Sequence, residues 1–164
     1  MTQAQALSCL VNGDSVFLTG PPGAGKTYVL NRFIKIARAR GKTVAVTAST
    51  GIAATHVSGV TIHSWSGLGI KERVSEHDLQ RMNATSKLVK RYNATDILII
   101  DEISMLHGVR LDAINQVAKT LRGSGAPFGG MQVVLVGDLY QLPPITRGNA
   151  RPDFAHRSEA WREL

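Results

Sequence analysis

Short apolar runs rich in β-branched residues alternate along the chain with longer stretches of helical periodicity. The runs predict four strands, at residues 16–19, 43–47, 96–100 and 132–136. Helices are predicted between them at residues 26–40, closing at Gly41, and through the repeat of Leu111, Ile114, Ala118 and Leu121, closing at Gly123. Continuous apolar strands that alternate with helices are typical of a parallel sheet with helices on both faces. The pattern therefore predicts an α/β fold.

The polar segment 67–93 does not fit this alternation. It contains six basic side chains against three acidic ones, and it lies between the second and third predicted strands. We interpret it as a small, partly helical insertion on the edge of the sheet. A short amphipathic run, residues 154–164, follows the last strand. A length of 164 residues corresponds to one globular domain, so residues 1–164 are expected to fold as a unit.

The charge balance narrows the class of partner. The chain has 19 Lys and Arg against 12 Asp and Glu, a formal net charge of +7, which favours a polyanion such as nucleic acid. No apolar run approaches the ~18 to 20 residues of a membrane span, so no membrane partner is expected. A single cysteine, Cys9, excludes an internal disulfide framework and indicates a reducing compartment. That compartment is the cytoplasm or nucleoid for a bacterial or viral protein, and the nucleus or mitochondrion for a eukaryotic one.

A glycine-rich loop between the first predicted strand and the first predicted helix carries the clearest chemistry. Residues 20–27 read GPPGAGKT, which matches G-x-x-x-x-G-K-[ST] in the context that this motif requires. The glycines let backbone amides wrap a phosphate chain at a helix N-terminus, Lys26 meets the β and γ phosphates, and the Thr27 hydroxyl is a ligand for Mg²⁺. The residues predicted to bind nucleotide here are Gly20, Pro22, Gly23, Ala24, Gly25, Lys26, Thr27 and Tyr28. The alternative, a structural turn with an exposed lysine, does not account for the complete motif.

Two carboxylates follow the third predicted strand in the sequence ILIIDE. Open α/β sheets bind ligands at the carboxyl ends of their strands, which is where Asp101 and Glu102 lie. Asp101 is the expected Mg²⁺ partner, and Glu102 is the candidate that orients and activates an attacking water. The alternative is that Glu102 is only a favourable charge at the start of a helix.

Gln141 follows the fourth predicted strand in the sequence VVLVGDLYQLPP. A side-chain amide near a γ phosphate can sense whether that phosphate is present and relay the information to a neighbouring element. The other interpretation is a turn locked by Pro143 and Pro144, with Gln141 in solvent. These residues alone leave both interpretations open.

The order of the motifs resembles the first RecA-like motor domain of the petite-integration-frequency family of DNA helicases, in superfamily one, group B. The resemblance rests on GPPGAGKT, VTASTGIAATHVSG, GVTIHSWSGLGI, LIIDEISML and GDLYQLPP, and it covers essentially the whole chain. It implies an ATP- and Mg²⁺-dependent motor that moves 5′ to 3′ on single-stranded DNA and unwinds duplexes at junctions. It also implies roles in replication, repair, recombination and telomere maintenance.

The resemblance also implies roles for single residues. Gln141 would couple the γ phosphate to the translocating domain, and the contacts to the single-stranded DNA backbone would come from Thr50, Gly51, Thr61, His63 and Ser64. Small hydroxyls and backbone amides suit such contacts, which hold register without reading sequence. The structural alternatives are a helix cap at Thr50 and a core-filling His63. Trp65 either stacks a DNA base or is buried beneath the insertion.

Gln5 and the insertion complete the implied assignments. Thr2 and Gln5 resemble the family's adenine-recognising motif, but Thr-x-x-Gln is also a helix capping box. The six basic residues of segment 67–93 match the family's strand-separating wedge in position, although such a run is also typical of a solvated face. They are Lys71, Arg73, Arg81, Lys87, Lys90 and Arg91.

The family's motor needs a second RecA-like domain that donates an arginine to the γ phosphate, and this sequence stops before one. We therefore expect the 164-residue chain to be monomeric, to bind ATP, to hydrolyse it slowly and not to unwind DNA alone. A different class of function remains the alternative: a nucleotide-gated module for single-stranded DNA, or a P-loop switch without unwinding activity.

Overall fold

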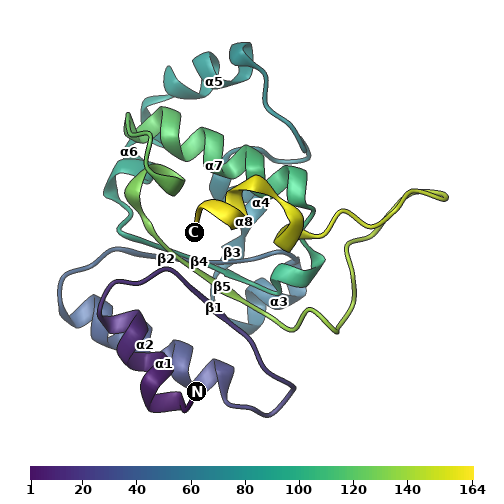
Figure 1. The fold of residues 1–164 in the computed structure, drawn as a ribbon. Coiled ribbons are helices and arrows are strands. Elements are labelled where there is room, and N and C mark those ends of the chain that lie inside the picture. The colour runs from purple at the N-terminus through teal and green to yellow at the C-terminus, as the bar shows by residue number, and fades with distance from the viewer.

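A single parallel sheet organises the chain. The computed structural model describes residues 1–164, and the sheet has five strands in the order β1-β5-β4-β2-β3 (Figure 1). The strands are β1 (Val16–Leu18), β2 (Val44–Ala48), β3 (Val60–Thr61), β4 (Ile97–Asp101) and β5 (Gln132–Val136). The four predicted strands are confirmed within a few residues. β3 was not predicted, because two residues are too few to show a period.

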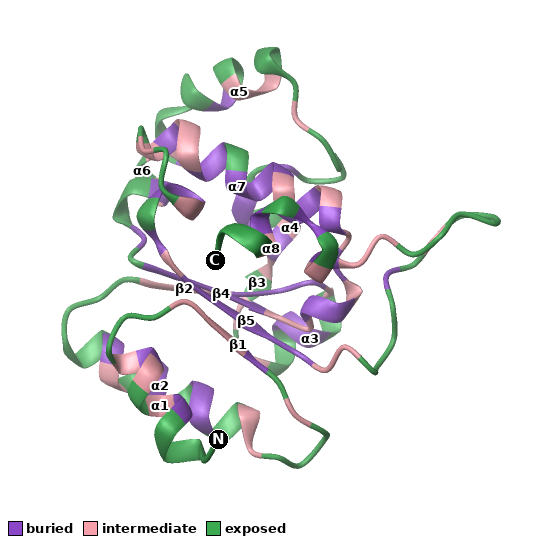
Figure 2. Ribbon diagram, viewed as in Figure 1, coloured by how far each residue is buried: buried purple, intermediate pink, exposed green.

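Helices cover both faces of the sheet, as predicted. On one face lie α1 (Gln3–Val11) and α2 (Lys26–Ala39); on the other lie α4 (Ile62–Ser66), α5 (Glu76–Asn83), α6 (Ser86–Ala94), α7 (Gly108–Arg122) and α8 (Glu159–Glu163), while α3 (Gly51–His56) follows β2 (Figure 1). Each face has its own apolar cluster, of 12 residues beneath α1 and α2 and of 22 residues beneath α7. The central strands β4 and β5, between the two clusters, are buried over four of their five residues (Figure 2), which explains their continuous apolar sequence. No helix has the length and apolar character needed to cross a bilayer.

The segment 67–93 is part of the helical layer, so its predicted position at the sheet edge is wrong. Its helices α5 and α6 pack against α7. Tyr92 is fully buried, and its hydroxyl donates a hydrogen bond to the Ser66 carbonyl at 2.9 Å. The Trp65 ring packs on Tyr92 with centroids 4.7 Å apart and is only 8% exposed, which selects the buried alternative for this tryptophan.

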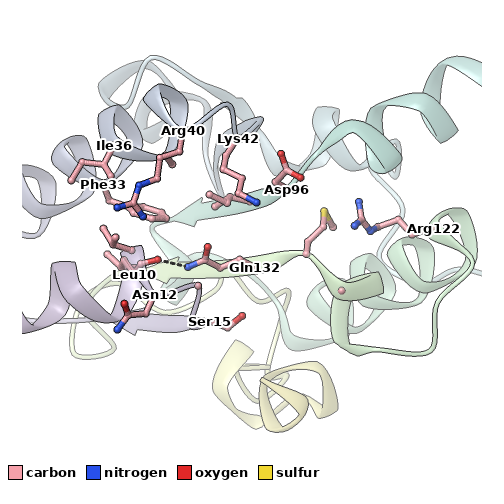
Figure 3. A pocket seen from close by; sticks show the side chains of 16 residues that line it. Leu10, Asn12, Ser15, Phe33, Ile36, Arg40, Lys42, Asp96, Arg122 and Gln132 are labelled. Carbon is pink, nitrogen blue, oxygen red and sulfur yellow. Dashed lines mark hydrogen bonds between the residues drawn. The ribbon is translucent and has the colours of Figure 1, made fainter.

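A pocket of about 440 Å³ opens at the amino ends of the strands, where α1 and α2 both end (Figure 3). The Gln132 amide donates hydrogen bonds there to the carbonyls of Leu10, at 2.9 Å, and Asp14, at 2.7 Å. Arg40 and Lys42 also line it. Helix C-termini carry partial negative charge, so these cations compensate the chain's own helix ends. The pocket therefore lies at the opposite edge of the sheet from the phosphate loop.

Candidate active site

The predicted functional segments meet at one edge because every strand pair of the sheet is parallel. Leu18 at the end of β1 pairs with Val136 at the end of β5, and Ala48 of β2 pairs with Asp101 of β4. The loops that follow these strands therefore leave the sheet side by side. They are the phosphate loop, the turn at Thr50, the acidic pair and the segment leading to Gln141.

The phosphate loop is held in shape by its own side chains and by α1. Gly25 has a φ of 91°, a left-handed conformation that residues with a side chain rarely adopt, so this position favours glycine. The Gln3 amide donates a hydrogen bond to the Ala24 carbonyl at 3.2 Å. The Lys26 ammonium donates to the carbonyls of Gly20 and, at 3.2 Å, Pro21. Lys26 is the first residue of α2, and these bonds direct its ammonium group back across the loop.

Gln3 was not predicted as a site residue, because its contact with Ala24 joins two segments that are 21 residues apart in the sequence. Gln5 completes a capping box: its side-chain oxygen accepts a hydrogen bond from the Thr2 amide at 2.8 Å, and its own amide donates to the Thr2 hydroxyl at 3.2 Å. The structural alternative for Gln5 is therefore present. Its role toward adenine stays a prediction.

A groove beside the loop runs between α1 and α2, with a volume of about 430 Å³. Tyr28 lines it and is largely exposed, with the Arg32 guanidinium 5.8 Å from the centre of its ring. The remaining lining residues are Thr2, Gln3, Ala4, Leu7 and Val29. The groove adjoins the phosphate loop through Gln3, which both lines it and binds the Ala24 carbonyl, and nucleotide contact at Tyr28 stays a prediction.

Asp101 and Glu102, the acidic pair, lie at the end of β4, and the pKa of each carboxyl is raised. Burial raises the pKa of Asp101, while a hydrogen bond from the Glu102 amide at 2.8 Å and the charge of Lys26 oppose this shift. Burial also raises the pKa of Glu102, helped by the negative charge of Asp101 and opposed by Lys26 and His56. Lys26 thus acts on both carboxylates, which shows that the loop cation and the acidic pair share one site.

Glu102 has a strained backbone, with φ 53° and ψ 46° in the left-handed region. Such a conformation costs a non-glycine residue roughly 1–3 kcal/mol and persists only where neighbours hold it. The Ser49 hydroxyl holds it here, donating to the Glu102 carbonyl at 2.6 Å. The carboxylate of Glu102 makes no capping hydrogen bond to the following turn, Ile103–Met105, so the helix-start alternative gains no support.

Ser49 lies in the segment VTASTGIAATHVSG that carries the family resemblance, but it was not predicted as a site residue because its partner Glu102 is 53 residues away. Its place directly after a predicted strand is a further signal. Pairing of β2 with β4 could not be derived from that strand's residues alone.

Gln141 lies beside Glu102. Both residues line a pocket of about 440 Å³, which Met105, Tyr140, Leu142 and Pro143 complete. The segment from the end of β5 to Gln141 forms a turn at Asp138. The Asp138 side chain accepts a hydrogen bond from the Tyr140 amide at 2.9 Å, and the Asp138 carbonyl accepts one from the Gln141 amide at 3.0 Å. The turn and the proximity to the acidic pair are both present, so the two interpretations of Gln141 are compatible.

The candidate DNA contacts begin two short helices. The Thr50 hydroxyl accepts from the Ala53 amide at 3.2 Å, and the Thr61 hydroxyl accepts from the Ser64 amide at 3.3 Å, so both threonines are helix caps. β3 pairs with β2 in a register that aligns Thr61 with Ala48, which brings the two caps to the same edge of the sheet. Gly51 and Ser64 are exposed there. Contact of this group with DNA stays a prediction.

His63 is half-buried beside this group. Burial lowers the pKa of His63, and the nearby charges of Arg110 and His107 lower it further. The lowered pKa favours the neutral imidazole, which can offer a hydrogen bond to a phosphate.

The basic residues of the insertion divide into two groups. Lys71 and Arg81 both bind the Asp78 carboxylate, and the Arg91 guanidinium donates to the Trp65 carbonyl at 2.7 Å. The other three, Arg73, Lys87 and Lys90, make no ion pair or side-chain hydrogen bond within the chain. These three have no partner within the chain, whereas Lys71 and Arg81 share one carboxylate and Arg91 keeps its charge beside a neutral carbonyl, so most of the positive charge of the insertion remains.

With the P-loop, the acidic pair and the Gln141 turn assembled at one edge of a parallel sheet, comparison with known proteins is decisive. Residues 3–164 match the family described as PIF1-like helicase. The chain belongs to the PIF1-like helicase family. The resemblance found in the sequence motifs is thereby confirmed.

Relatives and solved structures agree with this membership. The ATP-dependent DNA helicase Pif1 of Psychrobacter sp. (strain PRwf-1) is 55% identical over 163 residues, a match that covers 98% of this chain and 25% of the relative. The crystal structure of Pif1 helicase from Candida albicans superimposes with a TM-score of 0.90 at 42% identity, covering 98% of this chain and 36% of that one. Pif1 helicase from Bacteroides in complex with ADP-AlF3 and ssDNA gives a TM-score of 0.82 at 32% identity, covering 99% and 40%.

These matches confirm the predicted RecA-like α/β fold of a Pif1 motor domain. They also show that the chain spans about a quarter of the length of the Psychrobacter relative. What the whole relatives do is therefore a matter for proposal in this chain.

The donor set at the site fits a magnesium ion. The Thr27 hydroxyl, at the start of α2, and the Asp101 carboxylate, at the end of β4, are hard oxygen donors, and Mg²⁺ is usually held by one or two such groups together with substrate phosphates and waters. No group of three or more His, Cys, Asp or Glu side chains gathers anywhere in the chain to form an all-protein metal site.

The raised pKa of Glu102 predicts the pH dependence of ATP turnover. A general base acts in its deprotonated form, so the rate rises as pH increases through the pKa of Glu102. Because burial and Asp101 raise that pKa, the acidic limb of the kcat/KM profile is expected above the value of about 4.3 for a free glutamate. Steady-state turnover measured from pH 4 to 8 checks this. A limb at or below the free value contradicts the assignment.

Proposed function

We propose that the chain is the ATP-binding and ATP-hydrolysing motor domain of a 5′-to-3′ DNA helicase that translocates on single-stranded DNA and unwinds duplexes. The observation that carries the proposal is the convergence of Lys26, Asp101 and Glu102 at the edge where β1 and β4 end. A phosphate-binding cation beside a carboxylate of raised proton affinity is the arrangement that a P-loop ATP hydrolase needs.

In the proposed reaction the chain's residues bind, orient and move a proton. The loop amides and Lys26 hold the phosphates, Thr27 and Asp101 would hold Mg²⁺, and Glu102 accepts the proton of the water that attacks the γ phosphorus as the bond to the ADP oxygen breaks. Mg²⁺ supplies charge neutralisation on the phosphate oxygens. Gln141, facing the same pocket as Glu102, senses the γ phosphate and passes its loss to the segment that follows β5.

Single-stranded DNA is the proposed partner at the caps of α3 and α4. Support comes from the hydroxyls of Thr50, Thr61 and Ser64 and the exposed backbone of Gly51, from the net charge of +7, and from the structure of Bacteroides Pif1 in complex with ADP-AlF3 and ssDNA. Another Pif1 structure concerns forked dsDNA, which favours duplex junctions as substrates. Replication, repair, recombination and telomere maintenance are the processes that this activity would serve.

The proposal includes a second RecA-like domain. Relatives are about four times as long as this chain, and an arginine contributed from outside a P-loop site raises phosphoryl-transfer rates by roughly 10³–10⁵. Without such an arginine the chain is expected to hydrolyse ATP slowly and to unwind no duplex.

Equilibrium binding tests the proposal. We expect a fluorescent oligo-dT to bind this chain, with an affinity that changes when a non-hydrolysable ATP analogue and Mg²⁺ are added, because the two sites share one sheet edge. Lys26→Ala removes the nucleotide effect and leaves binding of oligo-dT alone intact. A nucleotide effect on DNA affinity without any ATP turnover would instead favour the nucleotide-gated binding module, and no oligo-dT binding would contradict both functions.

A further inference from the structure

Ser49 joins the acidic pair to the turn that carries the candidate DNA contacts. It lies directly after β2 and is 7% exposed. Its hydroxyl donates to the Glu102 carbonyl at 2.6 Å, and its amide donates to the Asp101 carbonyl at 3.0 Å. One residue thus holds the backbone of both carboxylates.

The direction of the Glu102 side chain depends on this hold. With φ at 53°, Glu102 occupies a region that non-glycine residues adopt only when both sides of the residue are restrained. On the amide side the restraint is the Asp101 carboxylate, at 2.8 Å; on the carbonyl side it is the Ser49 hydroxyl. Loss of either restraint allows the backbone to relax and the carboxylate to turn away from its place.

The next residue along the chain, Thr50, belongs to the proposed DNA contacts. Thr50 caps α3 through the Ala53 amide, and Gly51 begins that helix with its backbone exposed. A phosphate bound to Thr50 or Gly51 therefore acts on a segment whose preceding residue is bonded to Glu102. One peptide unit and one hydrogen bond thus separate the proposed DNA contact at Thr50 from Glu102.

We propose that Ser49 is a positioning residue that couples single-stranded DNA at Thr50 and Gly51 to the orientation of Glu102, so that stimulation of ATP hydrolysis by DNA passes through the Ser49 hydroxyl. The inference rests on the proposed function for its DNA and its reaction. It adds the route by which bound single-stranded DNA controls ATP hydrolysis.

The chain offers a matched control two residues earlier. The Thr47 hydroxyl donates to the Ile99 carbonyl at 2.6 Å, which is the same kind of bond between the same two strands. Thr47 is fully buried and bonds to neither Asp101 nor Glu102. Thr47→Val therefore removes a β2–β4 side-chain bond without touching the acidic pair.

Turnover with and without oligo-dT tests the proposal in Ser49→Ala, Ser49→Thr and Thr47→Val. Ser49→Ala is expected to lower DNA-stimulated kcat by about tenfold or more, in line with the cost of a small misplacement of a catalytic group, while KM for ATP and oligo-dT affinity change less than twofold. Ser49→Thr, which keeps a hydroxyl, and Thr47→Val retain the stimulation. Normal stimulation in Ser49→Ala, or an equal loss in Thr47→Val, overturns the proposal.

A second readout does not depend on hydrolysis. The carboxyl ¹³C resonance of Glu102, assigned with Glu102→Gln, is expected to shift when oligo-dT binds the unmodified chain and to stay fixed in Ser49→Ala. Absence of ATP turnover in the unmodified chain would contradict the proposed function, and the resonance would still decide the coupling. A resonance that responds equally in both proteins overturns the coupling even where turnover is normal.

Discussion

Replacing Glu102 with glutamine is expected to lower ATP turnover by about 10²–10⁴-fold while ATP binding persists. Glutamine matches glutamate in size and leaves the backbone bond from Ser49 in place, so the strained conformation at Glu102 is retained. The amide has no basic lone pair of comparable strength and does not accept the water proton. Lys26, Thr27 and the loop amides still hold the phosphates.

Single-turnover hydrolysis and titration with a fluorescent ATP analogue measure the two effects separately. Glu76→Gln is the matched control, because Glu76 is an exposed carboxylate in the first turn of α5, away from the site. Loss of ATP binding together with turnover in Glu102→Gln would mean that Glu102 holds the nucleotide and is not the base.

Replacing Lys26 with alanine is expected to weaken ATP binding by roughly 10- to 100-fold, the loss that accompanies removal of charge-assisted hydrogen bonds. Turnover of the residual bound ATP falls by about a further 10²–10³-fold, since the cation also stabilises charge that develops on the phosphate oxygens. The ammonium is already directed across the loop by the carbonyls of Gly20 and Pro21.

Lys42→Ala provides the comparison for this variant. Lys42 is an exposed lysine of the pocket at the amino ends of the strands, so its loss changes the net charge equally without reaching the phosphate loop. Calorimetric titration with ATP and Mg²⁺ measures the affinities. Equal affinities in the Lys26 and Lys42 variants would show that the loop cation does not contact the nucleotide.

Much of the fold could be predicted because strand and helix signals were strong where elements are long and buried. β2, β4 and β5 each have five residues and an apolar sequence, and α2 and α7 each span several turns. β3 and α4 are too short for any periodicity to appear. Tertiary pairing alone determines them.

The insertion was misplaced for a related reason. Its apolar positions, Met82, Leu88 and Tyr92, are separated by polar and basic residues and are divided between two helices. Only packing against α7 gathers them into one apolar surface. Part of the positive charge of the insertion is also paired within the chain, because Lys71 and Arg81 bind Asp78. Arg91 donates to a carbonyl of α4.

The site was predictable as far as its chemistry is local in sequence. A phosphate loop and an acidic strand end can each be recognised from a few consecutive residues. The left-handed backbone at Glu102 and its bond from Ser49 depend on which strands are neighbours, and no local pattern encodes that. Gln3 was overlooked because its contact with Ala24 forms only when α1 packs beside the loop.

We infer that this chain hydrolyses ATP with Glu102 as the base, under the control of single-stranded DNA. The most direct test is the rate of Mg²⁺-dependent ATP hydrolysis by the 164-residue chain with and without oligo-dT, for the unmodified protein and Glu102→Gln in parallel. We predict a slow rate that oligo-dT increases and that Glu102→Gln abolishes under both conditions. A rate that neither oligo-dT nor the substitution changes would contradict the account.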